Sequence, residues 1–173
     1  MTTYPYKFKT SVAGDVDAPY MLKKSLYEFV SPKTNATYMV WGEEYEHDFF
    51  AIKFHLRKDK NSKKRYSVMS NLHEARPVLN TCMKIMASIA KTNEFSSFGF
   101  IGANMSGESV ENTKRYRVYC RLAATYVSEE QFEHHINVKK SAYILVRKKA
   151  LERNPELIGE VSRKFIEMYP ALQ

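Results

Sequence analysis

One segment of the sequence places glycine, serine and several cations in an order that could bind an anion. Residues 96–122 read SSFGFIGANMSGESVENTKRYRVYCRL, an apolar stretch containing glycine, followed by a polar loop and a basic helix. Free backbone amides at the start of a helix, beside cationic side chains, can hold a phosphate or a carboxylate. The candidate ligand or partner contacts in this helix are Lys114, Arg115, Arg117 and Arg121.

The same residues are also compatible with an ordinary solvated helix. Lys114, Arg117 and Arg121 are spaced by three and four residues, so they share one helix face. Arg115 lies near the apolar stripe, where its stem can cover the edge of the core. The preceding loop contains two glutamates, Glu108 and Glu111. These carboxylates suit the positive end of the helix and would repel an incoming anion, so both interpretations stay open.

A second group of cations surrounds the polar sequence DKNSKK at residues 59–64. We interpret it as the tip of a hairpin between a strand over residues 48–58 and a returning strand over residues 65–69. Lysine-rich tips can contact nucleic-acid phosphates, although they also simply keep a hairpin soluble. The candidate contacts are Lys58, Lys63, Lys64 and Arg65.

Other chemistry is not indicated by the sequence. Its histidines have no metal-ligand spacing, and the adjacent His134 and His135 would point to opposite faces of a strand. No G-x-S-x-G or Walker motif occurs. We interpret Gly99 and Gly102 as bulge or close-approach positions in a strand. We therefore expect no metal, name no catalytic residue and favour a protein without enzymatic activity.

The composition is typical of a globular protein of the reducing cytoplasm. A chain of 173 residues is long enough to form one domain, over residues 1–173, with its own core. Cys82 and Cys120 fall in predicted helices, and we expect them to be buried free thiols. We expect neither a signal peptide nor a membrane span. The net charge of +8 favours acidic or polyanionic partners without identifying one.

Hydrophobic periodicity predicts strands in the first half of the chain. Residues 1–19 form either an irregular lead-in or an edge strand, and strands follow over residues 22–30, 37–41 and 48–58. In the last of these, apolar residues alternate with Lys53, His55 and Arg57, the pattern of a half-buried strand. Strands that are joined by successive short turns predict an antiparallel meander.

The second half alternates helices and strands. We predict a helix from Pro77 to about residue 91, a central strand over 95–103, a helix over 112–126 and strands over 132–138 and 142–147. Asn154 and Pro155 form a cap and first-turn pair for a closing helix. Its expected core face is Leu157, Ile158, Val161, Phe165 and Met168. The predicted class is α+β, with a mainly antiparallel or mixed central sheet and about three helices.

Several phrases of the sequence resemble the pattern of a family of small uncharacterised bacterial proteins. These phrases are RPVLNTCMKIM, SFGFIGAN, ENTKRYRVY, FEHH and SAYILV. In that pattern an F-G-F-x-G-A strand leads to a T-K-R-aromatic-R-x-Y helix and then to an S-A-Y-x-L strand. The resemblance spans residues 49–146 and implies a shared fold, and it transfers no catalytic residue.

The order of elements is also similar to that of the GNAT acetyltransferases, so a GNAT-like arrangement is one form that the predicted class can take. In that superfamily a Q/R-x-x-G-x-G/A turn before the central helix cradles the pyrophosphate of acetyl-CoA. The corresponding residues here, YSVMSNLHEARPV, contain no glycine. Tyr119 falls where such enzymes often carry a tyrosine that acts as general acid.

Three functional hypotheses follow. The first is a non-catalytic cytosolic binding module that engages a protein or a nucleic-acid-like polyanion through the basic helix face, without a cofactor. The second is a degenerate GNAT-like acyltransferase that binds acetyl-CoA or another nucleotide ligand. The third is a structural or inhibitory component of a phage or another mobile element.

Overall fold

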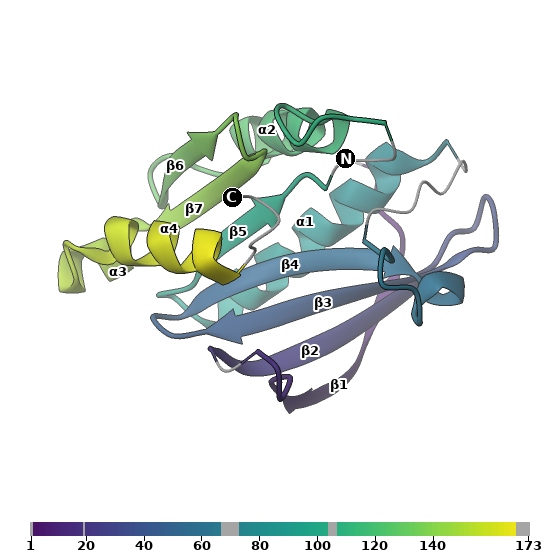
Figure 1. Ribbon diagram of the computed structural model, residues 1–173, viewed down its shortest axis with the longest axis horizontal. Coiled ribbons are helices and arrows are strands. Elements are labelled where there is room, and N and C mark those ends of the chain that lie inside the picture. The colour runs from purple at the N-terminus through teal and green to yellow at the C-terminus, as the bar shows by residue number, and fades with distance from the viewer. Residues whose placement is uncertain (1, 19, 67–72, 104–106, 169–173) are drawn as a thin grey trace.

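A computed structural model describes residues 2–18, 20–66, 73–103 and 107–168 of the chain, with side chains as far as residue 165 (Figure 1). The strands of these segments form one seven-stranded sheet in the order β1-β2-β3-β4-β5-β7-β6. Neighbouring strands are antiparallel except for the parallel pair of β4 and β5. The sheet is therefore mixed, and the predicted α+β class is confirmed.

The first four strands form the predicted antiparallel meander. Their bounds are β1 Tyr6–Ala13, β2 Met21–Val30, β3 Thr37–Tyr45 and β4 Phe49–Leu56. Of the two alternatives for the N-terminus, the structure contains the edge strand, because β1 ends the sheet order. β3 is longer than predicted, since it stays paired with β4 as far as the bridge between Tyr45 and Phe49.

The predicted hairpin after β4 is wrong for the residues that can be judged. Residues 57–66 form a short 3-10 helix, Arg57–Asp59, followed by turns. β4 is paired with β3 along one whole edge, whereas its other edge is paired with β5 only from Phe49 to Ala51. The remainder of the predicted strand, residues 67–69, lies outside the described residues.

The second half contains the predicted elements and one additional helix. The elements are α1 Ala75–Thr92, β5 Ser97–Ile101, α2 Lys114–Tyr126, β6 Phe132–Asn137, β7 Ala142–Arg147, α3 Lys148–Arg153 and α4 Leu157–Met168. Asn154 ends one helix and leads into the next: its N–H donates to the Ala150 carbonyl at 3.0 Å at the end of α3, and its Oδ1 accepts from the Glu156 N–H at 3.2 Å just before α4. α4 begins three residues later and buries Leu157, Val161 and Phe165. The side chain of Met168 lies outside the described ones.

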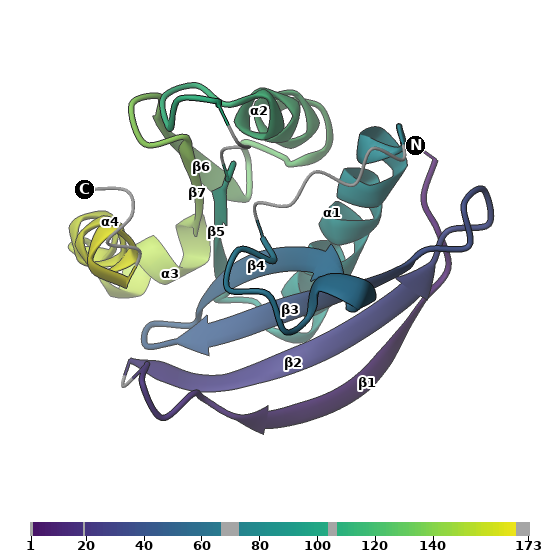
Figure 2. The ribbon, with the colours of Figure 1, turned by 45° about the vertical axis from the view of Figure 1, so that its right-hand side comes forward.

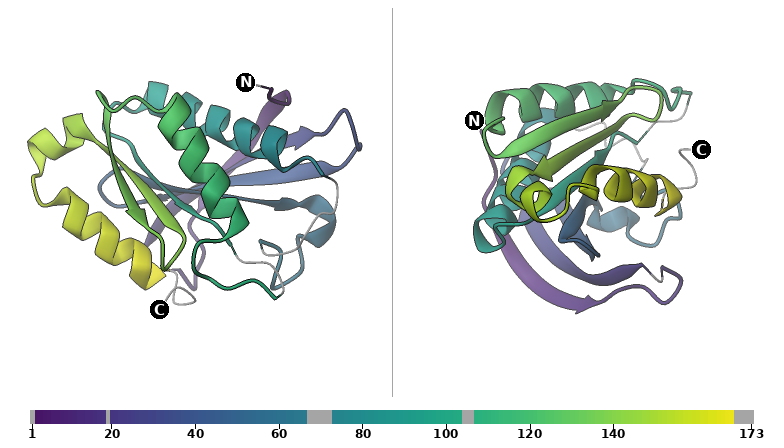
Figure 3. Two further views of the ribbon diagram at one scale, coloured as in Figure 1. Left: turned by 90° about the horizontal axis from the view of Figure 1, so that it is seen from above. Right: turned by 90° about the vertical axis from the view of Figure 1, so that its left-hand side faces the viewer.

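Apolar side chains cover both faces of the sheet in two separate clusters. One, which includes Ile52 and Phe98, packs under α1 and α2. The other, which includes Phe49 and Phe165, packs under α3 and α4. In the right-hand view of Figure 3, β6 and β7 lie between α2 and α4. Gly99 lets Phe49 and Phe165 of the second cluster pack closely against β5. A Cβ at this position would stand 2.6 Å from Phe49 Cζ and 2.8 Å from the Phe165 ring.

A buried carboxylate joins the start of α1 to the meander. Glu74 accepts hydrogen bonds at Oε2 from Tyr4 Oη (3.0 Å) and Ser31 Oγ (2.6 Å). Its Oε1 accepts from Thr34 Oγ1 (2.9 Å) and Tyr38 Oη (2.7 Å). Burial alone would raise the pKa of Glu74, but the four hydroxyl donors together hold it below its usual value. The charged, buried carboxylate therefore ties the start of α1 to the N-terminal segment, to β3 and to the turn between β2 and β3.

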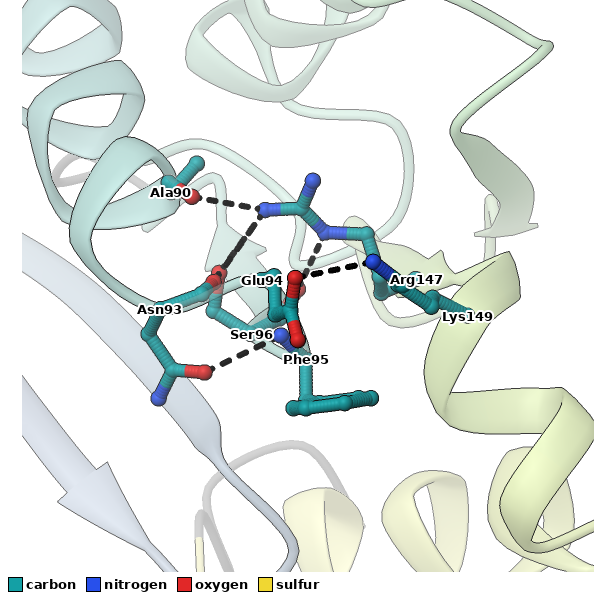
Figure 4. Close-up of polar contacts among 7 residues, drawn as sticks. All are labelled: Ala90, Asn93, Glu94, Phe95, Ser96, Arg147 and Lys149. Atoms are coloured by element: carbon teal, nitrogen blue, oxygen red, sulfur yellow. Dashed lines mark hydrogen bonds and ion pairs between the residues drawn. The ribbon is translucent and has the colours of Figure 1, made fainter.

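Arg147, at the end of β7, holds the other end of α1 (Figure 4). Its Nη2 donates to the carbonyls of Ala90 (3.0 Å) and Asn93 (3.3 Å), and its Nε donates to the Ser96 carbonyl (3.3 Å). The guanidinium carbon lies 4.4 Å from the centroid of the Phe132 ring. Burial lowers the pKa of Arg147. This side chain satisfies carbonyls that a helix end leaves without partners.

Candidate functional site

The start of α2 is built on a buried junction of three residues. Thr113 caps the helix, with its Oγ1 accepting from the Tyr116 N–H (3.1 Å) and donating to the Gly102 carbonyl (2.6 Å). Ser141 Oγ accepts from the Thr113 N–H (2.9 Å) and donates to the Val110 carbonyl (2.6 Å). The Gly102 N–H donates to the Ser141 carbonyl (2.9 Å). The end of β5, the start of α2 and the turn before β7 thus meet at one point.

This junction takes one residue from each of three phrases of the sequence. F-G-F-x-G-A contributes Gly102, T-K-R contributes Thr113 and S-A-Y-x-L contributes Ser141, and all three residues are buried. The expected close backbone approach is confirmed at Gly102, which lies just after β5, whereas the atoms that approach Gly99 belong to the Phe49 and Phe165 side chains. At Gly102 a Cβ would stand 2.3 Å from the Tyr116 nitrogen. In this structure the three phrases therefore attach α2 to the sheet, and their buried residues do not form an exposed site.

The amide at the first residue of α2 already has an anionic partner. Glu108 Oε2 accepts a hydrogen bond from the Lys114 N–H at 2.9 Å. A carboxylate there complements the positive end of the helix. The Glu108 carboxylate thus occupies the position at which the sequence analysis expected an external phosphate or carboxylate to bind.

The cations of α2 divide into an exposed stripe and one inward-facing arginine. Lys114, Arg117 and Arg121 are all exposed, as their shared face predicts. Arg115 is half-buried, with its Nη1 donating to the Tyr66 carbonyl at 2.7 Å and its guanidinium carbon 4.7 Å from the Phe54 ring centroid. Arg115 therefore links α2 to the segment after β4 and does not belong to the exposed stripe.

The cations after β4 also differ in exposure. Lys58, Lys60, Lys63 and Lys64 are exposed. Arg65 is half-buried, with its guanidinium carbon 4.8 Å from the Tyr66 ring centroid and its Nη1 donating to the Ser62 carbonyl at 3.3 Å. Because Arg115 is bonded to Tyr66, this lysine-rich segment and the start of α2 lie next to each other.

A buried polar cluster on β3 and β4 was not predicted. His55 was expected to face solvent, but it is only 4% exposed because the Tyr66 ring lies against it, with the centroids 5.4 Å apart. Its Nε2 accepts from Trp41 Nε1 at 3.2 Å, and its Nδ1 lies 2.9 Å from the Leu56 carbonyl. Burial is the main cause that lowers the pKa of His55. Strand alternation could not reveal this, since the covering ring comes from the following segment.

Other candidate groups are enclosed by the fold. Tyr119 is 3% exposed, its ring centroid lies 5.0 Å from that of Phe100, and burial raises its pKa. Both cysteines are free, Cys82 buried and Cys120 half-buried, and burial raises the pKa of Cys82 to about 12. Within the described segments no group of His, Cys, Asp or Glu side chains could hold a metal. No described helix has the length and apolar character needed to cross a membrane.

The protein thus belongs to the α+β class, with a mixed sheet that carries helices on both faces. Its exposed cations lie on the segment that follows β4 and on α2, whose first turn contacts that segment. Comparisons with protein families, curated proteins and solved structures found no match.

Proposed function

We propose that this chain binds nucleic acid through a basic surface. The basic surface consists of Lys58, Lys60, Lys63, Lys64, Lys114, Arg117 and Arg121. The observation that carries the proposal is the hydrogen bond from Arg115 Nη1 to the Tyr66 carbonyl, because it places the segment that carries the exposed lysines beside the start of α2. Dense positive charge on one part of a surface attracts polyanions and speeds their association.

The basic surface has more cations than there are acids beside it. Its seven cations exceed the three acids Asp59, Glu108 and Glu111 by four. These acids oppose the binding of an anion, and Glu111 is the exposed one beside the stripe. The stripe from Lys114 to Arg121 extends about 10 Å along the helix axis, a length that matches about three phosphates of one strand.

Binding should depend steeply on salt and on the stripe of α2. We expect the triple variant Lys114→Glu, Arg117→Glu and Arg121→Glu to bind a fluorescent oligonucleotide much more weakly and to reduce the slope of log K against log salt by about 3. Fluorescence anisotropy in a salt series measures both effects. The exposed set Lys33→Glu, Lys91→Glu and Lys139→Glu makes the same change in net charge elsewhere.

Equal losses in the two triple variants would contradict the proposed site and indicate a general effect of net charge. If the chain bound an acidic protein but no oligonucleotide, the basic surface would be a protein-binding surface and the nucleic-acid proposal would be wrong. We also place the protein in the cytoplasm, where free cysteines such as Cys82 and Cys120 are usual.

An acyltransferase is the second candidate, favoured by the parallel pair at the centre of the sheet. β4 and β5 are bridged only from Phe49 to Ala51 and from Ser97 to Gly99, and beyond these residues the strands separate (Figure 2). Open sheets often bind ligands beyond the carboxyl ends of such strands. Against this candidate, Pro77 removes one amide from the first turn of α1, and Tyr119 is enclosed.

A thermal-shift assay with acetyl-CoA tests this second candidate. A ligand at a hundred times its Kd stabilises the folded protein by about 2.7 kcal/mol, which for a chain of this size raises Tm by roughly 5–10 °C. An unchanged Tm at millimolar acetyl-CoA would reject it, and inorganic pyrophosphate serves as a control for simple anion binding.

A further inference from the structure

Three aromatic rings form a cluster at the outer edge of the sheet, on the face that carries α1. The ring centroids of Phe8 and Tyr27 are 5.5 Å apart, and those of Tyr6 and Tyr27 are 6.1 Å apart, both in edge-to-face geometry. Phe8 is 57% exposed, whereas Tyr6 and Tyr27 are half-buried. A large apolar ring that stays this exposed beside a packed core is available to a partner.

The cluster is held in place before any partner arrives. Tyr6 and Tyr27 pack against the main core cluster. A Cβ built on Gly42 of β3 would stand 4.0 Å from Tyr27 Cε2, so this ring lies over the neighbouring strand. Phe8 therefore rests on an ordered ring, and little conformational entropy remains to be lost when another ring stacks on it.

Polar groups continue along the same face. Ser11 and Ser25 are paired in the register of β1 and β2, and their Oγ atoms lie 3.2 Å apart. The next position of β2 on this face is Lys23, which is exposed and 3.6 Å from Glu44 Oε2. Rings, hydroxyls and a cation thus follow one another over the two strands.

The charge of β1 and β2 favours an anionic partner. Their cations are Lys7, Lys9, Lys23 and Lys24, and their single acid is Glu28. Lys23 lies on the aromatic face, whereas Lys7 and Lys24 lie on the opposite face, where Lys24 pairs with Asp15 at 2.6 Å. Glu28 is already paired with Arg57. A partner that offers both flat rings and negative charge matches this surface, and single-stranded nucleic acid offers both.

We infer that the aromatic face of β1 and β2 stacks unpaired bases, with Phe8 as the contacting ring, so that the chain prefers single-stranded nucleic acid. This inference rests on the proposed function and adds the kind of nucleic acid to it. The aromatic face is separate from the basic surface, which lies on α2 and on the segment after β4, so each can be tested without the other.

The test measures affinity for an oligothymidylate of about 15 nucleotides, for a duplex and for heparin, which has charge without bases. We expect Phe8→Ala to weaken oligothymidylate binding by about five- to a hundredfold and to leave heparin binding unchanged, because one stacked base is lost. Phe8→Trp should keep the affinity. Val12→Ala is the matched control, since Val12 is 42% exposed on the same strand and pairs with Lys24 on the opposite face.

Each result decides between the two claims. An unchanged affinity of Phe8→Ala for oligothymidylate would overturn the stacking inference, while the basic surface would stand if the α2 triple variant lost binding. A loss equal for oligothymidylate and heparin would also overturn it. If Phe8→Ala weakened oligothymidylate binding and the α2 triple variant did not, the stacking inference would be supported and the proposed role of the basic surface would be refuted. A protein that binds none of the three ligands would refute both claims.

Discussion

Replacing Gly102 by alanine is expected to lower the free energy of unfolding by about 3 kcal/mol or more. The added Cβ would stand 2.3 Å from the Tyr116 nitrogen and 2.5 Å from Thr113 Oγ1, so the first turn of α2 must move away from β5. That movement also strains the hydrogen bonds that Thr113 donates to Ser141 Oγ and to the Gly102 carbonyl. Urea unfolding measures the loss.

Gly159→Ala is the matched control for this variant. No atom lies within 4 Å of a Cβ built at Gly159, which sits inside α4, so alanine there should leave stability equal or slightly higher. A Gly102→Ala protein with wild-type stability would show that α2 is not attached in the way described. The same variant also tests the basic surface, since Lys114 begins the helix that moves.

The second large effect is expected for Arg147→Met. Methionine keeps the apolar stem but removes the side-chain hydrogen bonds to Ala90, Asn93 and Ser96, of which Ser96 is fully buried and the other two are half-buried. We expect the free energy of unfolding to fall by about 3 kcal/mol, because buried acceptors lose charged donors. Thermal or urea unfolding measures this.

The neighbouring Lys149→Met is the control for Arg147 (Figure 4). Lys149 lies two residues away and forms an exposed ion pair with Glu94 at 2.8 Å, so its loss should leave the unfolding transition nearly unchanged. Similar behaviour of the two variants would mean that Arg147 acts only as a surface charge.

The sequence predicted elements whose pattern is local. The apolar stripe of α1 and the short strand β7 were located to within two residues, because repeats at three to four residues or at two residues need no knowledge of the partner. The hairpin after β4 was wrong because the chain continues into a 3-10 helix and turns, and the Tyr66 carbonyl accepts from Arg115, a contact from 49 residues later that the local pattern does not reveal.

The candidate site was predictable only in part. The exposed stripe of α2 followed from spacing alone. The inward position of Arg115 depends on Tyr66, and the burial of His55 depends on the same tyrosine, which lies outside both elements. Asn154 showed a related limit, since its side chain accepts the Glu156 amide before α4 as predicted, while its own N–H also ends α3, a helix that the sequence did not predict.

The four-hydroxyl environment of Glu74 has a consequence for strand register. Tyr38 is the donor from β3, and a slip of β3 by one residue would carry its hydroxyl to the opposite face of the sheet. The carboxylate would then lose a donor while it remained buried, which is unfavourable for a charged group. The hydroxyls of Tyr4, Ser31 and Thr34 likewise reach the Glu74 carboxylate only when their own segments pack in the native position. Glu74 therefore discriminates against misaligned versions of the meander, beyond any stability it gives to the correct one.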